Sequence, residues 1–236
     1  MEKNVEKRLL FLGVLFIFAI ASYVLTATGN TVELVETKSE TETLKIYLQI
    51  PKLQNTKNSE FENYFNTLIQ NKVREVVEEV KKMAESALSN GFLTSKYEVH
   101  ISTEIKYKAN DFVSLGIYYY TFTGGAHGNT IIETYNIDLV KSKLLSLKDI
   151  FYADCEYQKI IKEEIIKSLT ARSDEFFPEA IEYVSNQNLS EQPFTITNKY
   201  LEIYYQDYEI APHSTGLPVF EIPKSLLKDC LRVKLP

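Results

Sequence analysis

Residues 122–129 have the sequence FTGGAHGN, in which three glycines surround one of only three histidines in the chain. A histidine in a glycine-rich loop could serve catalysis, a metal ion or a phosphate group. A Walker phosphate loop requires G-x-x-x-x-G-K-[ST], and a dinucleotide site requires G-x-G-x-x-G at the start of a helix. Neither pattern is present, and the residues that follow alternate as in a strand. The loop therefore does not predict phosphate binding.

The histidines also fail to predict a metal centre. His100, His127 and His213 lie far apart in the sequence, and no two of them have the spacing of ligands on one helix or short hairpin. No serine elbow motif is present either. We predict no metal, no cofactor and no catalytic residue. Two roles stay open for the loop, a wide hairpin turn fixed by histidine hydrogen bonds or a ligand-binding loop, and its candidate residues are Gly124, Gly125, His127 and Gly128.

Aromatic residues are abundant, with 16 tyrosines and 13 phenylalanines, and many of them fall in strand-like segments. Successive residues of a strand point to opposite faces, so Tyr118 and Tyr120 are expected to face away from Tyr119. If exposed, these two rings would offer flat apolar area with a polar tip to a protein or a sugar. The alternative is a core on both faces of the sheet. Tyr118 and Tyr120 are therefore candidate aromatic contacts.

The start of the chain has the pattern of an exported protein. Its first eight residues carry three cations, and residues 9–25 carry no charge. Such a segment is typical of a signal peptide or a membrane anchor, and both alternatives stay open. We assign residues 1–28 to this segment and the polar residues 29–43 to a tether. The remainder is predicted to be extracytoplasmic, either secreted or held at the cell membrane.

Hydrophobic periodicity predicts an α+β fold. Residues 44–50 alternate as a strand that ends at Pro51, and Ser59 with Glu62 forms a predicted capping box for a long amphipathic helix. Strand patterns then precede and follow the glycine loop, residues 144–151 form a short extended piece, and two short helices and three more strands follow. We predict antiparallel sheets packed against the long helix in two small subdomains, residues 44–108 and 109–236.

Charge and cysteine content bound the function further. The formal net charge is −6 without a long basic run, which excludes a typical nucleic-acid site and suits a basic partner. Cys155 and Cys230 lie 75 positions apart. Outside the cytoplasm they could form a disulfide, and two buried free thiols are the alternative.

Three motifs resemble a known family. They are TFTGGAHGNTIIETYNIDL at 121–139, LLSLKDIF at 144–151, and FTIT followed by LEIYYQDYEIAPHSTGLPVFEIP within 194–223. Together they resemble a bacterial extracytoplasmic domain family of largely unknown function. That domain occurs as the exported part of anti-sigma factor V, which is similar to a lysozyme receptor. It also occurs as the non-catalytic N-terminal region of peptidoglycan deacetylase C.

The resemblance implies a binding module and carries over no catalytic residue. Its implied partner is a basic cell-wall-acting protein such as lysozyme. The alternatives are a peptidoglycan-binding module and, third, a hydrolase or metalloenzyme of the envelope. The family pattern is clearest in the glycine loop and in the segment from Tyr208 to Pro212, so these two stretches form the predicted site. Either stretch could instead be purely structural.

Overall fold

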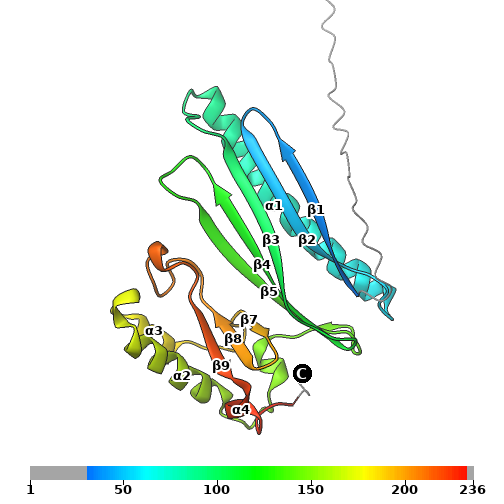
Figure 1. Ribbon diagram of the computed structural model, residues 1–236, viewed down its shortest axis with the longest axis vertical. Helices are drawn as coiled ribbons and strands as arrows, with labels where there is room; N and C mark the ends of the chain where they lie inside the picture. Colours follow the sequence, from blue (N-terminus) through cyan, green and yellow to red (C-terminus); the bar gives the residue numbers. More distant parts are fainter. Residues whose placement is uncertain (1–30, 233–236) are drawn as a thin grey trace, which may run out of the picture.

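The computed structural model describes residues 31–232. The predicted signal or anchor segment, residues 1–28, lies outside the described residues. Between residues 31 and 232, no helix is long and apolar enough to cross a membrane. The architecture is the predicted α+β class: one large sheet carries a long helix, and a small sheet packs against short helices (Figure 1).

The large sheet has six strands in sequence order. They are β1 (Val32–Glu40), β2 (Leu44–Leu53), β3 (Tyr97–Lys108), β4 (Phe112–Phe122), β5 (Asn129–Asp138) and β6 (Lys143–Leu144). All neighbouring pairs are antiparallel except β2 and β3, which run parallel. A parallel pair needs a crossover connection, and the long helix α1 (Ser59–Ser89) supplies it.

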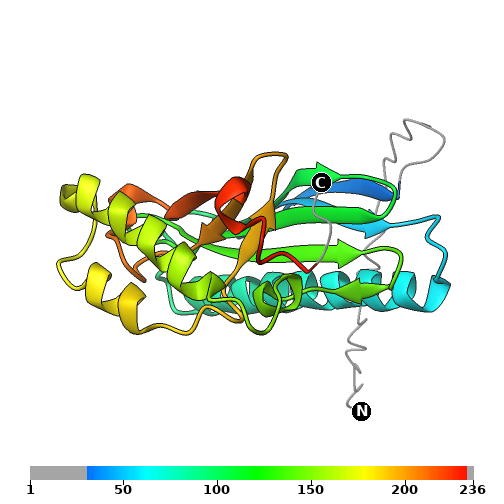
Figure 2. The ribbon, with the colours of Figure 1, turned by 90° about the horizontal axis from the view of Figure 1, so that it is seen from below.

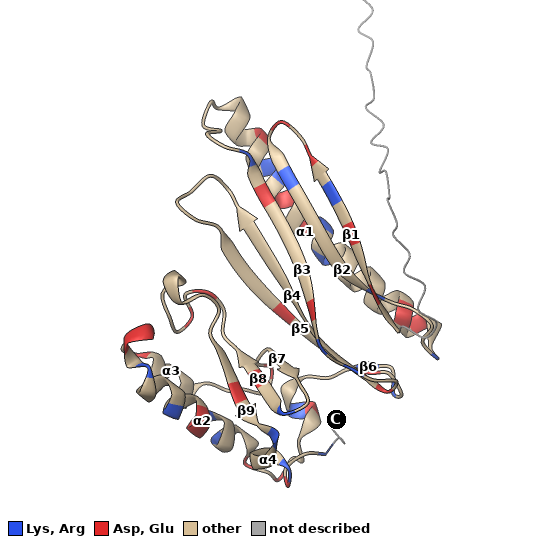
Figure 3. Ribbon diagram, in the orientation of Figure 1, with Lys and Arg blue, Asp and Glu red and all other residues tan. Residues whose placement is uncertain are grey.

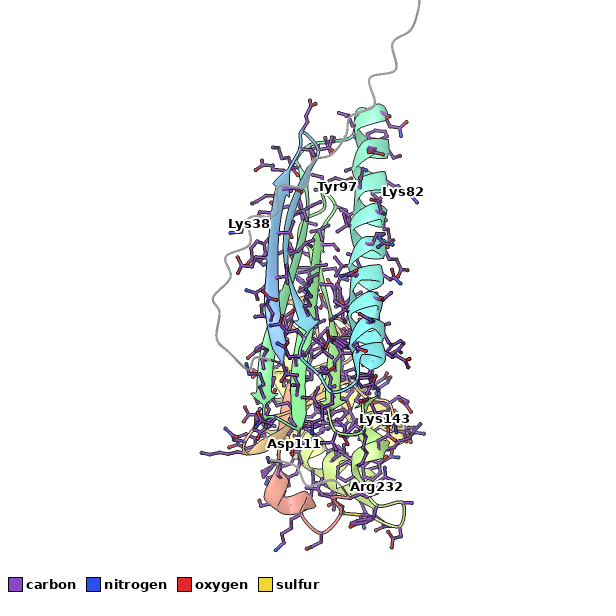
Figure 4. All side chains as sticks on the ribbon, turned by 90° about the vertical axis from the view of Figure 1, so that its right-hand side faces the viewer. Lys38, Lys82, Tyr97, Asp111, Lys143 and Arg232 are labelled. Atoms are coloured by element: carbon purple, nitrogen blue, oxygen red, sulfur yellow. A yellow bond between two sulfur atoms is a disulfide. The ribbon has the colours of Figure 1, made fainter. Side chains whose placement is uncertain are left out.

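Helix α1 covers one face of this sheet. Its apolar stripe includes Phe65, Ile69 and Val73, which belong to one buried cluster with the inward residues of β3 and β4. Figure 2 and Figure 4 show α1 along one side of the sheet; in Figure 4, Lys82 points outward from the helix and Lys38 lies on the opposite side of the sheet. The face opposite α1 is therefore the one on which a second layer could pack.

The second part begins after β6. It contains the 3-10 turn η1 (Leu147–Ile150), α2 (Tyr157–Ala171), the turn η2 (Ser173–Glu175), α3 (Ala180–Asn186), β7 (Phe194–Ile196), β8 (Tyr200–Tyr204), the turn η3 (His213–Thr215), β9 (Val219–Pro223) and α4 (Lys224–Leu227). Strands β7, β8 and β9 form an antiparallel sheet. One face of it, including Leu201, Ile203 and Phe220, shares a buried cluster with residues of α2 and α3.

The two sheets meet through a buried polar junction. On β4, the Ser114 hydroxyl donates to Asn136 Oδ1 at 2.6 Å and accepts from the Ile196 backbone N–H at 2.7 Å. Lys106 Nζ of β3 lies 3.3 Å from Glu202 Oε2 of β8. Tyr204 and Thr195 also donate to this carboxylate, at 2.7 and 2.8 Å. Each side chain named here has at least one hydrogen-bond or ion-pair partner, as expected where polar atoms lose contact with water.

Three sequence-based boundaries were wrong. Residues 32–40 of the predicted tether form the edge strand β1. Pro51 does not end β2, because it pairs only with β1 there and its missing N–H disrupts no second ladder. The break at residue 108 cuts the large sheet, because β4 and β5 continue from β3; the two buried clusters separate near residue 145 instead.

Two local predictions also need correction. The helix cap is Asn58, whose side chain accepts from the Phe61 N–H at 3.0 Å; Ser59 is already helical, and Glu62 binds Thr56 instead. Within residues 144–151, Leu147–Ile150 form a 3-10 turn and not an extended strand. Asp149 starts this turn by accepting from the Ser146 N–H at 3.0 Å.

Candidate functional site

The glycine loop joins β4 to β5, and two of its glycines have a packing reason. Gly124 has a φ of 86°, a conformation that side chains disfavour, and a Cβ there would lie 3.1 Å from the Tyr97 ring. A Cβ on Gly128 would lie 2.3 Å from the Tyr120 ring. A Cβ on Gly125 would meet only the His127 carbonyl oxygen at 3.8 Å. Gly124 and Gly128 therefore let the loop pack on two tyrosines.

A second loop, residues 205–216, lies beside the first. Tyr208 in this loop is 52% exposed, yet its φ is 62°. A left-handed conformation costs a residue other than glycine roughly 1–2 kcal/mol, and it is uncommon for a bulky side chain. Strained residues of this kind cluster at ligand clamps and other functional sites. The backbone at Tyr208 is thus held in a conformation that local preferences oppose.

The two loops bring three rings together. His127 and His213 stack with ring centroids 3.9 Å apart, and the ring of Tyr208 stacks on His213 at 5.8 Å. The Tyr208 hydroxyl lies 3.3 Å from His127 Nε2. His213 Nδ1 lies 2.5 Å from Asp207 Oδ2. We call these four side chains, Asp207, His127, Tyr208 and His213, the loop platform.

Hydrogen bonding fixes which ring nitrogens carry protons. His127 Nδ1 lies 2.9 Å from the Gly128 carbonyl oxygen, which can only accept, so Nδ1–H is the donor. In the neutral ring, His127 Nε2 then accepts from the Tyr208 hydroxyl. His213 Nδ1–H donates to Asp207, and in the neutral ring Nε2 is the remaining acceptor. Within residues 31–232, neither that nitrogen nor the buried Asp207 Oδ1 has a hydrogen-bond partner.

The surroundings of the platform are acidic. The Tyr183 hydroxyl donates to Glu209 at 2.9 Å, and the Phe177 N–H donates to the Ile210 carbonyl at 3.0 Å, so residues 172–186 border the second loop. These two segments contain one cation, Arg172, which pairs with Glu175 at 3.2 Å. Their acidic residues are Asp174, Glu175, Glu179, Glu182, Asp207 and Glu209. The tip of the β4–β5 hairpin has no charge (Figure 3).

The platform has few features of a catalytic centre. It contains an oriented imidazole, since a carboxylate holds His213, but within residues 31–232 no serine or cysteine side chain forms a hydrogen bond with His213 Nε2. Between residues 31 and 232, no group of three or more His, Cys, Asp or Glu side chains could hold a metal ion. The parallel His127 and His213 rings would also direct their nitrogens at separate points, since a metal must lie in the plane of each ring. What the arrangement offers is a surface of ring faces and acceptors.

The structure places the other predicted residues as follows. Pro212 precedes the turn η3 and so positions His213. Tyr118 and Tyr120 are half-buried on the sheet face opposite α1, where Tyr118 donates to Glu104 at 3.2 Å. Cys155 and Cys230 are joined as a disulfide with Cα atoms 5.5 Å apart, which ties η1 and α2 to the end of the described chain.

Two platform residues, Asp207 and His213, were missed as site residues from sequence. Asp207 directly precedes Tyr208, and His213 directly follows Pro212. Both lie inside the motif that carries the family resemblance. An acid and a histidine six residues apart in one loop are a weak signal, because only the turn of the loop brings their side chains together.

Two protein-family models match this chain. The model described as Deacetylase PdaC matches residues 37–130, and the model described as Protein of unknown function (DUF3298) matches residues 148–225. The predicted resemblance is confirmed. The first range covers α1 and strands β2 to β4 with the end of β1, and the second covers α2, α3 and strands β7 to β9; residues 131–147, which hold most of β5 and all of β6, lie in neither range.

Curated relatives agree with these families. Peptidoglycan-N-acetylmuramic acid deacetylase PdaC of Bacillus subtilis is 28% identical over 180 residues, 75% of this chain and 37% of the relative. The chain therefore spans little more than a third of that enzyme. Anti-sigma-V factor RsiV of Bacillus subtilis is 26% identical over 214 residues, 86% of this chain and 70% of the relative.

Solved structures support the fold alone. A DUF3298 family member from Bacteroides fragilis has a TM-score of 0.60 at 18% identity, covering 86% of this chain and 93% of its own. A DUF3298 family protein from Pseudomonas aeruginosa has a TM-score of 0.56 at 18% identity, covering 85% and 94%. The α+β arrangement of both sheets is thus shared beyond the curated relatives.

Proposed function

We propose that this chain is a non-catalytic binding module of the bacterial cell envelope. Its partner is a basic protein that acts on the cell wall, with lysozyme as the example. The module lies outside the cytoplasm, secreted or held at the membrane by residues 1–28. One relative supports this environment, because it is named as a peptidoglycan-N-acetylmuramic acid deacetylase and so acts on the cell wall.

The exposed loop platform carries the proposal. It combines ring faces from two loops with an acidic border, and a basic partner would complement that border in charge. Tyrosine is enriched at protein interfaces because it adds rigid contact area with a polar tip. The strained conformation of Tyr208 holds such a ring in solvent where a glycine would relieve the backbone. These features together support recognition of a protein surface.

The experiment uses the full chain in a non-ionic detergent, mixed with a basic lysozyme. We expect a one-to-one complex whose affinity falls as salt rises from about 0.05 to 0.5 M, because screening weakens charge complementarity. A Tyr152→Ala variant is the matched control, since Tyr152 is 48% exposed but lies beside η1, away from the platform. It should bind like the wild type. Absence of a complex at both salt concentrations would refute the proposal.

A second candidate, peptidoglycan binding, has its own observation. Cross-strand pairing aligns Lys38, Tyr47, His100 and Tyr120 in one row on the sheet face opposite α1. The Tyr47 and His100 ring centroids are 4.6 Å apart, and Lys38 Nζ lies 4.9 Å from the Tyr47 ring. A row of rings with hydrogen-bonding neighbours suits a sugar chain. Sedimentation of the full chain with insoluble peptidoglycan, without a lysozyme complex, would favour this function.

A further inference from the structure

The loop platform has used all its own hydrogen-bond donors. His127 Nδ1–H donates to the Gly128 carbonyl, the Tyr208 O–H to His127, and His213 Nδ1–H to Asp207. The groups that remain at the surface are acceptors and ring faces: His213 Nε2, the Tyr208 oxygen and the open side of its ring, while Asp207 Oδ1 is also unpartnered but buried. A ligand for this surface must therefore bring the donors.

The negative charge of the platform indicates that its ligand is a cation. The Asp207 side chain is only 6% exposed, and the hydrogen bond that stabilises its negative charge comes from the His213 N–H. In the described part of the chain, no lysine or arginine forms an ion pair with Asp207 or Glu209. The buried Oδ1 of Asp207 accepts no hydrogen bond there. The platform thus keeps negative charge beside its rings.

Shape favours a planar cation. The rings of Tyr208 and His213 are within 17° of parallel, and the His127 and His213 rings are within 19°. A guanidinium is flat, stacks on aromatic faces and carries five N–H donors, whereas an ammonium is a compact, strongly hydrated charge. We propose that the loop platform is a seat for an arginine side chain of the partner. This inference rests on the proposed function and names the group that the partner inserts.

In the seat, the guanidinium lies over the exposed part of the Tyr208 ring next to His213. One N–H donates to His213 Nε2, and the positive charge is attracted by the buried Asp207 carboxylate, which hydrogen-bonds the other nitrogen of that ring and does not contact the arginine. His127 does not touch the arginine; it is a positioning residue that holds the Tyr208 hydroxyl and stacks beneath His213. The strained backbone of Tyr208 presents the ring in advance, so less ordering is needed when arginine binds.

The chain provides its own internal control for a test, because it has three histidines. The full chain is labelled with ¹³C at histidine Cε1 and titrated with an acetylated tri-arginine amide. We expect shifts of the His213 and His127 signals, while the His100 signal on the sheet face stays in place. The isosteric tri-citrulline peptide, which is neutral, should shift none of them. Equal shifts with both peptides, or a shift of His100 alone, would overturn the seat.

Two variants separate recognition from folding. Tyr208→Gly removes the ring and relieves the positive φ, so we expect its urea midpoint to stay at or above the wild-type value. Its tri-arginine affinity should fall about five-fold, the loss of one cation–π contact. Asp207→Asn keeps the shape of the side chain and should weaken binding similarly. Wild-type affinity in both variants would refute the proposal, and Tyr208→Asn, which also tolerates positive φ, repeats the test independently.

The outcome also distinguishes this inference from the proposed function. If lysozyme binds equally well to wild type and Tyr208→Gly, and tri-arginine leaves His213 unshifted, the module stands and the seat is wrong. If tri-arginine shifts His213 but no lysozyme complex forms, the seat stands and the proposed partner is wrong.

Discussion

The two parts of the chain meet at two places that differ in how far their polar groups are satisfied. At the buried junction, Lys106 and Glu202 pair between the sheets, and the Glu202 carboxylate accepts two further hydrogen bonds. At the loop platform, Asp207 Oδ1 and His213 Nε2 have no partner in the described residues, and Tyr208 is exposed in a strained conformation. Carboxylate and aromatic side chains therefore have hydrogen-bond partners at the buried junction, whereas some polar atoms at the loop platform have none.

The difference teaches how to separate architecture from recognition. A buried polar group without a partner is destabilising, so a junction that only holds a fold is satisfied internally. A ligand-binding surface can instead contain hydrogen-bond acceptors without a partner and a residue in a strained backbone conformation. We therefore expect changes at the buried junction to alter stability, and changes at the loop platform to alter binding.

The largest expected effect is at the buried junction. Glu202→Leu leaves the Lys106 ammonium, which is only 17% exposed, with Glu104 as its remaining partner. Removing one member of a buried pair costs 3–5 kcal/mol, and we expect about 3 kcal/mol because Glu104 remains. Urea unfolding measures this change. The control is Glu221→Leu on the paired strand, which is exposed and should change stability by less than about 0.5 kcal/mol. Equal effects would contradict the contrast.

A smaller effect is expected in the glycine loop. Gly128→Ala places a Cβ 2.3 Å from the Tyr120 ring, so the ring or the loop must shift. Overpacking of this kind typically costs 1–3 kcal/mol, and we expect about 2 kcal/mol together with weaker lysozyme binding. The matched variant Gly125→Ala meets no side chain and should leave both quantities nearly unchanged. Wild-type stability in Gly128→Ala would show that Tyr120 moves freely.

The sequence predicted elements better than their connections. Helix α1 and the strands on either side of the glycine loop follow from apolar periodicity, which is strong over their lengths. Strand β1 was not predicted, because few apolar residues alternate with its polar ones. It forms by pairing with β2, and that pairing is a tertiary contact. The predicted subdomain boundary at residue 108 was also wrong, because apolar periodicity does not show which strands share a sheet.

The site was predictable in part. Gly124 and His127 stood out because glycine and histidine are rare here, and Tyr208 stood out through the family motif. Asp207 and His213 became visible only in the structure, because stacking on His127 joins residues more than 80 positions apart. No local pattern encodes such a contact.

A pH series sharpens the comparison further. Burial alone would raise the pKa of Glu202, but hydrogen bonds from Tyr204 and Thr195 and the charge of Lys106 hold it below its usual value. A lowered folded pKa means that this stability is present above about pH 4.3 and is lost as pH falls through the folded value. Unfolding measured from pH 7 to pH 3 should show the loss, and Glu202→Gln should reduce it.

The smallest effect is expected at Tyr118, which separates the two candidate functions. Tyr118→Phe keeps the ring and removes the hydroxyl that donates to Glu104 at 3.2 Å. A partly exposed hydrogen bond contributes about 0.5 kcal/mol, so stability should fall by roughly that amount. Lysozyme binding should be unchanged, because Tyr118 lies on the sheet face opposite α1, beside Glu104, Lys106 and Tyr204 of the buried junction, and not in the platform. Weaker sedimentation with peptidoglycan in this variant, at unchanged lysozyme affinity, would instead place sugar recognition on that face.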